Sequence, residues 1–409
     1  MWTQALSPVA VAGVILLSAP GINAEEITVT VAGGDWDRTN TVVTFQLPGD
    51  ATDARVLEDA DGNRLPLQVS GDARASFILS HLRNGEEATY RLVERDPSDD
   101  LQGWVEAARD NGRLRFSVEG VPSLYYQAEE RPFPRANINP SVKRGGFLHP
   151  VMSPSGRTAT SSYPPLHAHH QGIWAPWTRT EFQGRNPDFW NMHAETGKVE
   201  FTEIEGYWSG PVHGGFRSQH EFIDLSADEP VVALYETWEL KLYRIPGSET
   251  GYRLFDLYLE QETATSDPVT LLEHHYGGLG FRGHDDWIGE ENTRFLTSEG
   301  VTDRNEGNGT RTRWTYISGE VDGEQTGIAI FCHPENFRFP QPVRLHPDEP
   351  FFCYAPSQLG DWEITPDEPY TARYRFAVID GDPDLVELER LWNDYAHPPE
   401  VRVEPGDLP

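Results

Sequence analysis

The residues best suited to chemistry lie in two short segments rich in histidine, residues 163–174 and 273–278. The first holds three histidines within four positions between two prolines and a glycine. The second sets a histidine pair between a glutamate and a tyrosine. Imidazole titrates near neutral pH, so such clusters can exchange protons, hold a metal ion or bind a polar ligand. We expect the two segments to share one catalytic site, formed by His167, His169, His170, Glu273, His274, His275 and Tyr276.

Three interpretations of these histidines are open. In acid–base chemistry, His169 or His275 would donate the proton, and Glu273 or Tyr276 would be the partner base. In a metal site, a divalent ion would be bound by His167 and His169 together with His275 or Glu273, although the spacing matches no strong zinc signature. Hydrogen bonding to the loop backbone would explain the same residues without any catalytic role.

Aromatic residues crowd the chain just after the first histidine segment. Their flat faces suit the apolar faces of sugar rings, although packing in a core explains them as well. Polar side chains between them favour a loop that faces a ligand, and an arginine would neutralise the carboxylate of an acidic sugar. The candidate binding residues are His149, Arg157, Trp174, Trp177, Asp188, Trp190, Arg282, His333 and Arg338.

Composition limits the partners and the location of the protein. The net charge is -32, with 65 acidic and 33 basic residues, which disfavours nucleic acid and anionic membranes. Residues 1–24 combine an apolar stretch with a small-residue ending at Ala24, so we expect a signal peptide and a periplasmic or secreted protein. Cys332 and Cys353 are the only cysteines, and a disulfide and two buried thiols are both open.

Alternating apolar and polar runs separated by turn residues predict an all-β fold. The pattern divides into a small N-terminal β-sandwich module over residues 25–97 and a large antiparallel β-sandwich over 104–400. One amphipathic stretch over 382–395 predicts a C-terminal helix, with Asp382 as N-cap and Pro383 in the first turn.

The order of motifs resembles the PmoA-like family, a domain of unknown function often labelled "methane oxygenase PmoA". The resemblance spans most of the chain from about Trp104, and its motifs are residues 147–156, 163–174, 188–190, 274–282 and 333–340. The chain departs from the family pattern at Leu166, where an aspartate is common, and at Gln171, where an arginine is frequent. The resemblance implies a supersandwich similar to the galactose-mutarotase-like fold, which is frequent among sugar-active proteins.

These features together predict a secreted or periplasmic carbohydrate-active enzyme that applies His/Glu acid–base chemistry to a sugar or oligosaccharide. Hydrolysis, elimination and anomer interconversion are all open. A non-catalytic sugar-binding protein is the first alternative. The second is a metal-dependent oxygenase, as the family label suggests, and a divalent metal is the one cofactor considered.

Overall fold

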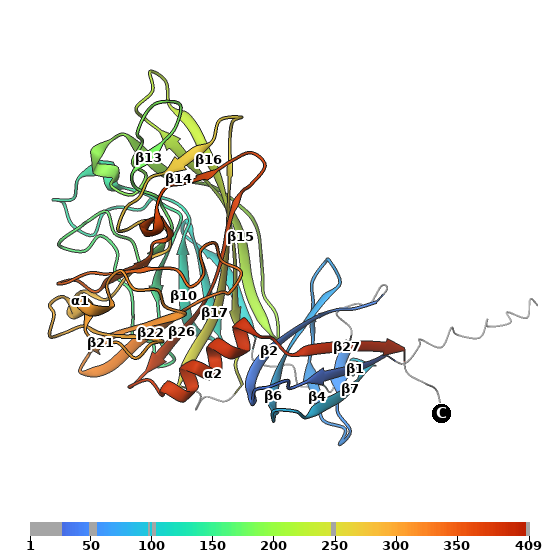
Figure 1. Ribbon diagram of the computed structural model, residues 1–409. Helices are drawn as coiled ribbons and strands as arrows, with labels where there is room; N and C mark the ends of the chain where they lie inside the picture. The colour runs from blue at the N-terminus through green and yellow to red at the C-terminus, as the bar shows by residue number, and fades with distance from the viewer. Residues whose placement is uncertain (1–26, 49–54, 97–98, 100–103, 247–250, 406–409) are drawn as a thin grey trace, which may run out of the picture.

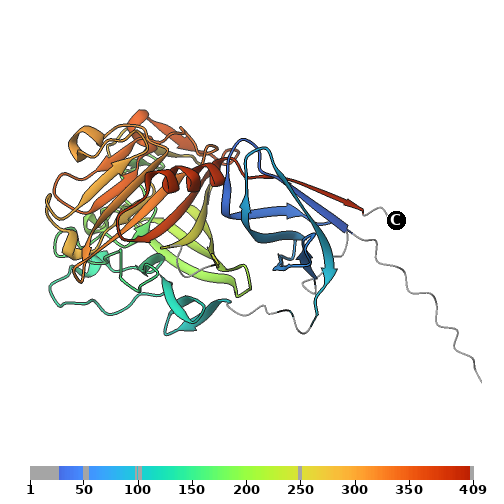
Figure 2. The same ribbon diagram turned by 90° about the horizontal axis from the view of Figure 1, so that it is seen from below.

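The structure is a computed structural model that describes residues 27–48, 55–96, 99, 104–246 and 251–405. It has a large β-sandwich with a smaller β module beside one of its ends (Figures 1 and 2). The predicted all-β class is confirmed, while the predicted signal peptide lies outside the described residues. Among the described residues, no helix combines the length and the apolar character needed to cross a membrane.

Two antiparallel sheets of eight strands make up the large sandwich. The first large sheet contains, in spatial order, β23 (Val343–Leu345), β24 (Phe351–Tyr354), β19 (Gly280–Arg282), β12 (Ile173–Trp174), β11 (Phe147–Val151), β10 (Val121–Gln127), β9 (Arg113–Val118) and β8 (Val105–Asp110). The second contains β14 (Gly197–Trp208), β15 (His213–Asp224), β16 (Val231–Tyr243), β17 (Tyr252–Thr263), β26 (Tyr370–Asp380), β22 (Glu324–Cys332), β21 (Trp314–Val321) and β20 (Arg294–Thr297).

Short elements complete the large sandwich. A three-stranded sheet joins β13 (Thr180–Glu181), β18 (Val269–Leu271) and β25 (Trp362–Ile364). The short helices are η1 (Pro140–Val142), η2 (Met192–Ala194), η3 (Asp285–Trp287), α1 (Arg304–Gly307) and η4 (Pro356–Leu359).

The part of the first large sheet formed by β11, β12, β19 and β24 is buried on both faces. Successive strand residues point to opposite faces, so Leu148 and Ile173 enter the main core between the two large sheets. Their neighbours Phe147 and Trp174 belong to a second apolar cluster on the outer face. That cluster also contains residues from the connecting segments, which therefore cover the outer face: Ile138, Val142, Tyr163 and Trp190.

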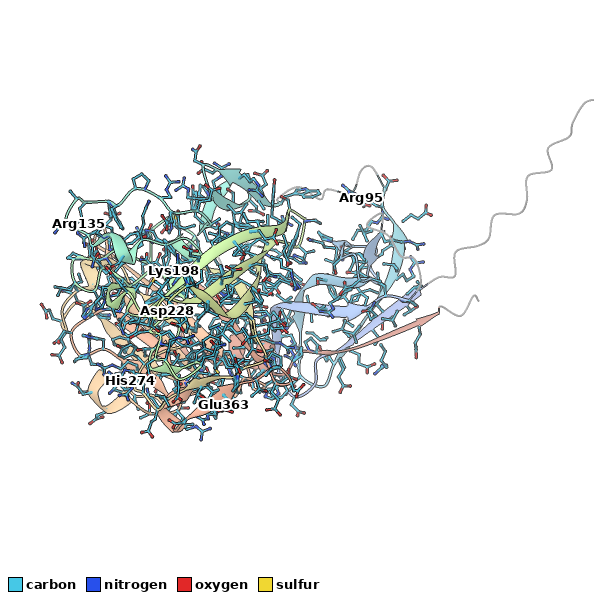
Figure 3. The ribbon with its side chains drawn as sticks, turned by 90° about the horizontal axis from the view of Figure 1, so that it is seen from above. Arg95, Arg135, Lys198, Asp228, His274 and Glu363 are labelled. Carbon is cyan, nitrogen blue, oxygen red and sulfur yellow. The ribbon has the colours of Figure 1, made fainter. Side chains whose placement is uncertain are left out.

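The N-terminal module packs two small sheets. One contains β27 (Glu400–Pro405), β1 (Ile27–Ala32), β7 (Glu87–Glu94), β3 (Arg55–Glu58) and β4 (Arg64–Pro66), and the other contains β2 (Arg38–Gln46), β6 (Arg74–Leu82) and β5 (Gln68–Val69). The C-terminal strand β27 thus returns to pair with β1. Figure 3 shows Arg95 of the module and His274 of the sandwich at opposite ends of the molecule.

The predicted C-terminal helix is confirmed as α2 (Leu385–Ala396), but its N-cap differs from the expected one. Asp384, two residues after the predicted cap, accepts the hydrogen bond from the backbone N–H of Val386 at 2.9 Å. The expectation placed the cap before Pro383, yet the helix begins only after a second aspartate that can fill the same role. Near its other end, Asp394 is buried and pairs with Arg38 of the module at 3.0 Å.

Cys332 and Cys353 are free, buried thiols. The interpretation as two separate thiols therefore holds, and no bridge joins β22 to β24. Burial raises the pKa of each thiol to about 12, so both are protonated and unreactive at neutral pH.

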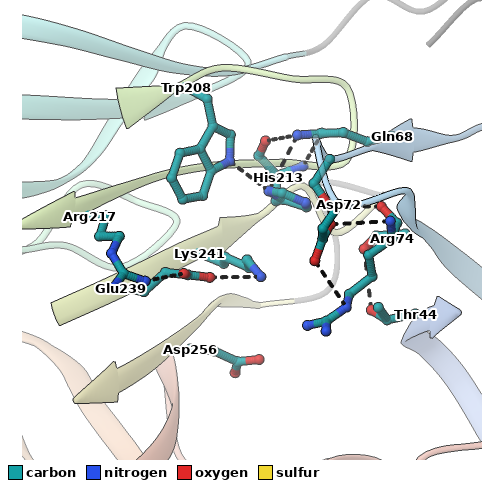
Figure 4. Close-up of polar contacts among 12 residues, drawn as sticks. Thr44, Gln68, Asp72, Arg74, Trp208, His213, Arg217, Glu239, Lys241 and Asp256 are labelled. Atoms are coloured by element: carbon teal, nitrogen blue, oxygen red, sulfur yellow. Dashed lines mark hydrogen bonds and ion pairs between the residues drawn. The ribbon is translucent and has the colours of Figure 1, made fainter. Parts of the chain in front are cut away.

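Gln68 joins the module to the large sandwich (Figure 4). Its Oε1 accepts hydrogen bonds from the backbone N–H groups of Val212 and His213, and its Nε2 donates to the carbonyl of His213 at 2.9 Å. A Cβ at Gly210 would lie 2.2 Å from Oε1 of Gln68, so only glycine admits this side chain. His213 is buried, and its Nδ1 accepts a hydrogen bond from Nε1 of Trp208 at 3.0 Å.

This junction should be sensitive to acid. Burial, and secondarily Lys241, lowers the pKa of His213 to about 3, whereas an unfolded histidine titrates near 6.5. The unfolded state therefore takes up the proton first, and stability falls as the pH drops from 6.5 towards 3. At pH 5 the loss from His213 amounts to about 2 kcal/mol.

We expect urea unfolding at pH 7.5 and pH 5 to show a smaller acid effect in His213→Gln, whose side-chain oxygen can still accept from Trp208. His81→Gln, at an exposed histidine of the module, should keep the wild-type dependence. Equal acid effects in wild type and His213→Gln would contradict the assignment.

Candidate functional site

The candidate site lies at one end of the first large sheet, where three connections meet. In the sheet, β12 pairs with both β11 and β19, and β19 pairs with β24. Because these pairs are antiparallel, the β11–β12 connection, the last residue of β19 and the β23–β24 connection all lie at the same end of the strands. We call residues 163–172 of the first connection the histidine loop and residues 346–350 of the last connection the glutamate loop.

A buried ion pair joins the glutamate loop to the sheet. Arg282, the last residue of β19, donates from Nη1 to Oε2 of Glu349. Arg282 is 0% exposed and Glu349 is 2% exposed. Burial lowers the pKa of Arg282 to about 10, so the guanidinium remains charged at neutral pH. Arg282 is among the binding residues predicted from the sequence, whereas Glu349 is not.

His167 is the histidine that reaches this pair. Its Nδ1 lies 3.6 Å from Oε2 of Glu349, and its side chain is 43% exposed. Its backbone is left-handed, with φ of 57°, which is costly for a residue with a Cβ and is often found at functional sites. Burial, and secondarily Arg282, lowers the pKa of His167, so the imidazole is neutral at pH 7. With its proton on Nδ1 towards the carboxylate, Nε2 would accept a proton.

Further histidines surround His167. The His170 ring lies parallel to it with centroids 5.1 Å apart, and the His346 ring of the glutamate loop is 5.7 Å away. The ring centroid of His169 lies 4.6 Å from that of His170 and 5.2 Å from that of the exposed His193. Burial lowers the pKa of His169 to about 3 and that of His346 to about 4. His167, His169 and His346 are therefore neutral imidazoles beside one permanent cation, Arg282.

Polar atoms without a protein partner gather at this site. Six buried side-chain atoms here have no hydrogen-bond partner among the described residues. They are Nδ1 of His170, Oε1 and Nε2 of Gln171, Nε and Nη2 of Arg282, and Oε1 of Glu349. Buried polar groups are nearly always satisfied, so such a concentration needs an explanation. These atoms have the capacity to bind a polar ligand or water.

The second histidine segment touches this site only through aromatic rings. The ring centroid of Trp190 lies 6.1 Å from that of His170 and 5.4 Å from that of Tyr276. The Tyr276 hydroxyl accepts a hydrogen bond from Nδ2 of Asn191 at 2.9 Å. His274 and His275 pack on Tyr276, at 4.4 and 4.9 Å. Glu273, by contrast, is exposed. The carboxylate beside the histidine loop is therefore Glu349. The sequence predicted Glu273 in this position, and that prediction is wrong.

The three tryptophans expected to face a ligand are buried instead. Trp174, Trp177 and Trp190 are 0%, 1% and 2% exposed. Trp174 and Trp190 belong to the outer-face cluster and flank His170, with Trp174 at 5.3 Å. Trp177 packs in the main core and donates from Nε1 to Gln261. In this structure they support the site from beneath and offer no open stacking face.

The remaining predicted binding residues make mainly structural contacts. Arg157 lies 3.5 Å from Asp380, and His333 packs against Tyr395 of α2. Arg338 donates to the carbonyls of Pro356, Gly360 and Asp361. Asp188 accepts from the backbone N–H groups of Trp190 and Asn191. None of these contacts joins the cluster around His167.

A cavity of about 310 Å³ adjoins the histidine loop on the same face of the sheet. Its charged lining is three arginines and one glutamate, Arg113, Arg131, Arg144 and Glu129, and His149 and Tyr163 also face it. Tyr163 belongs to the histidine loop, and its N–H donates to the carbonyl of His170 at 3.1 Å. Three arginines in one small cavity contrast with the strongly acidic composition of the chain. We call it the arginine cavity.

The described residues provide no set of ligands for the metal site considered from the sequence. Among the described residues, no group of three or more His, Cys, Asp or Glu side chains is arranged to hold a metal ion. His167 and His169 lie with their rings nearly perpendicular, and the ring contacts described for His275 are with its neighbours His274 and Tyr276. The three predicted metal ligands therefore do not converge.

The glutamate loop was not among the predicted site segments, although its sequence pattern is distinctive. Its sequence, His346-Pro-Asp-Glu-Pro350, places a histidine before one proline and two carboxylates between that proline and the next. Nothing local indicates that it lies beside His167, because that contact depends on the strand order of the sheet.

Comparisons with known proteins identify a family but no activity. A model described as "Family of unknown function (DUF6807)" matches residues 113–393, from β9 into α2. No curated protein matches. Among solved structures, a protein in glycosyl hydrolase family 38 from Enterococcus faecalis is similar, with 10% identity and a TM-score of 0.44, over 94% of this chain and 48% of that one. The chain thus spans about half the length of that structure.

The Arg282–Glu349 pair makes a testable prediction about stability. Removing one partner leaves the other charge buried and uncompensated, so Arg282→Met and Glu349→Leu should each lower the free energy of unfolding by about 3 kcal/mol or more. The double variant should lose less than the sum, because neither charge then remains. Urea denaturation would measure this.

Arg157→Met serves as the control, since it removes a more exposed ion pair and should cost less than about 1 kcal/mol. If the two single losses simply added in the double variant, the two side chains would not be coupled as described.

Proposed function

This chain belongs to the DUF6807 family of unknown function, and we propose that it is a carbohydrate-active enzyme whose active site is built on the histidine loop. The observation that carries the proposal is His167, a partly exposed imidazole beside a buried arginine–glutamate pair. A neutral imidazole with one nitrogen facing a carboxylate is arranged as a general base. The carboxylate orients the ring and stabilises the imidazolium that forms.

The chemistry supported is proton abstraction. The described contacts of the cluster include one carboxylate, Glu349, and it is buried and occupied by Arg282. Most glycosidases use two carboxyl groups that flank the bond to be cleaved. A single imidazole base fits elimination or anomer interconversion better than hydrolysis. The imidazolium formed on His167 would then give this proton to the leaving oxygen, so the elimination balances without a second proton donor.

The substrate class favoured is an acidic sugar. A uronate carries a carboxylate that arginine recognises well, and the arginine cavity adjoins the loop that holds His167. Neutralising that carboxylate acidifies the proton on the adjacent carbon, which His167 would remove in β-elimination. The expected secretion and the resemblance to a galactose-mutarotase-like supersandwich also support a saccharide. A local basic cavity would offset the repulsion from the acidic surface.

The proposal is tested by incubating the purified protein with uronate-containing and neutral oligosaccharides. Products would be followed by absorbance of the unsaturated uronate, by new reducing ends and by NMR of the anomeric protons. Turnover should appear with an acidic member, and His167→Gln should lower kcat by about 100-fold or more with little change in KM.

His81→Gln, at an exposed histidine on β6, is the matched control and should retain full activity. Full activity of His167→Gln would overturn the assignment of the base. Binding of a sugar without turnover would instead indicate a non-catalytic sugar-binding protein.

The pH dependence should follow the same base. The imidazole of His167 must be unprotonated to act, and its pKa is lowered from 6.5 by burial and by Arg282. Activity should therefore persist below pH 6.5 and fall only as the pH passes through the lowered pKa. A profile of kcat/KM against pH with its acid limb above 6.5 would disagree with this assignment.

A further inference from the structure

A cavity of about 600 Å³ lies between the N-terminal module and the edge of the second large sheet. Module residues on its wall include Gln68, Asp72 and Arg74, while Trp208, Glu239 and Lys241 come from the sandwich (Figure 4). Its size falls in the range of small-molecule sites, which often form at domain boundaries. It shares no lining residue with the arginine cavity.

Two tryptophans give this cavity its aromatic surface. Trp104 is 40% exposed, which is unusual for so large an apolar side chain. The Trp208 indole is held in place, because its Nε1 donates to His213 at 3.0 Å. A Cβ at Gly215 would lie 2.4 Å from Cζ2 of Trp208, so the indole packs directly against that strand. A ligand would therefore meet an aromatic wall that is already positioned.

Of the five charged residues that line the cavity, four form two ion pairs, and Arg95 is the fifth. Lys241 pairs with Glu239 at 2.9 Å, and Arg74 lies 3.8 Å from Asp72. Each of these cations thus has its own carboxylate, and the wall presents donors and acceptors together. Hydroxyl groups, which both donate and accept, match such a surface better than a carboxylate or phosphate does. The arginine cavity has a larger excess of cations, because its lining holds three arginines and one glutamate.

We propose that this cavity is an accessory, non-catalytic binding site for an uncharged oligosaccharide. The apolar faces of its sugar rings would stack on Trp104 and Trp208, and its hydroxyls would bond to the paired charges. The site is independent of the proposed active site, which lies on the first large sheet. Its function would be to hold the protein on a polymer or to position one segment of a longer chain.

Isothermal titration of the full chain with maltohexaose, cellohexaose, laminarihexaose and xylohexaose tests the proposal. At least one of these uncharged hexasaccharides should bind, and Trp104→Ala should weaken that binding by tenfold or more. The matched control is Tyr235→Ala, because Tyr235 is a similarly exposed aromatic residue, 41%, on β16 outside the cavity. This control should bind as the wild type does.

Three results would overturn the proposal. They are the absence of binding to all four hexasaccharides, unchanged affinity in Trp104→Ala, and tighter binding of hexagalacturonate at Trp104 than of any neutral chain. His167→Gln should keep the affinity, which separates this site from the proposed active site. Binding lost in His167→Gln but kept in Trp104→Ala would assign the sugar to the active site instead and overturn the accessory site.

Discussion

The arrangement of the candidate site depends on one buried ion pair, Arg282 with Glu349. A guanidinium on the outer face of an apolar sheet would be costly to bury alone, and the glutamate loop supplies its counter-charge. The cost of desolvating both charges offsets much of their attraction, so the main effect of the pair is to fix the geometry of the site. It fixes the glutamate loop against β19, and the same carboxylate oxygen that accepts from Arg282 also faces Nδ1 of His167. One interaction thus positions a base, its orienting carboxylate and a cation.

The first large sheet is buried on both faces at β11, β12, β19 and β24, and this explains why such a pair is possible. Its inner face packs on the main core, and its outer face is covered by the connections that carry the functional residues. Aromatic side chains pack beneath the cluster: the ring centroids of Trp174 and Phe351 lie 5.3 and 4.6 Å from that of His170. Water is thereby kept from the buried side of the imidazoles, and this is the physical reason why their pKa values are low.

The sequence predicted features that depend on local pattern. Alternation identified the β class, and the apolar stripe identified α2, although the cap moved from Asp382 to Asp384 because either aspartate can fill that role. It could not identify Glu349, because the contact with His167 joins segments about 180 residues apart through the strand order β24, β19, β12, β11. Nor could it tell that Trp174 and Trp190 are buried, because alternation does not reveal whether loops cover the outer face of a sheet.

The attachment of the N-terminal module gives the cavity beside it a definite shape. The chain enters the module at its start and returns to it at its end, where β27 pairs with β1 along six residues. Asp394 of α2 also accepts from Arg38 and Thr41 on β2, and Gln68 bonds to the backbone beside His213. These contacts lie in different parts of the junction, so rotation about any one of them would break the others. A cavity bounded by such a junction has fixed walls, which lowers the entropy cost of binding a ligand there.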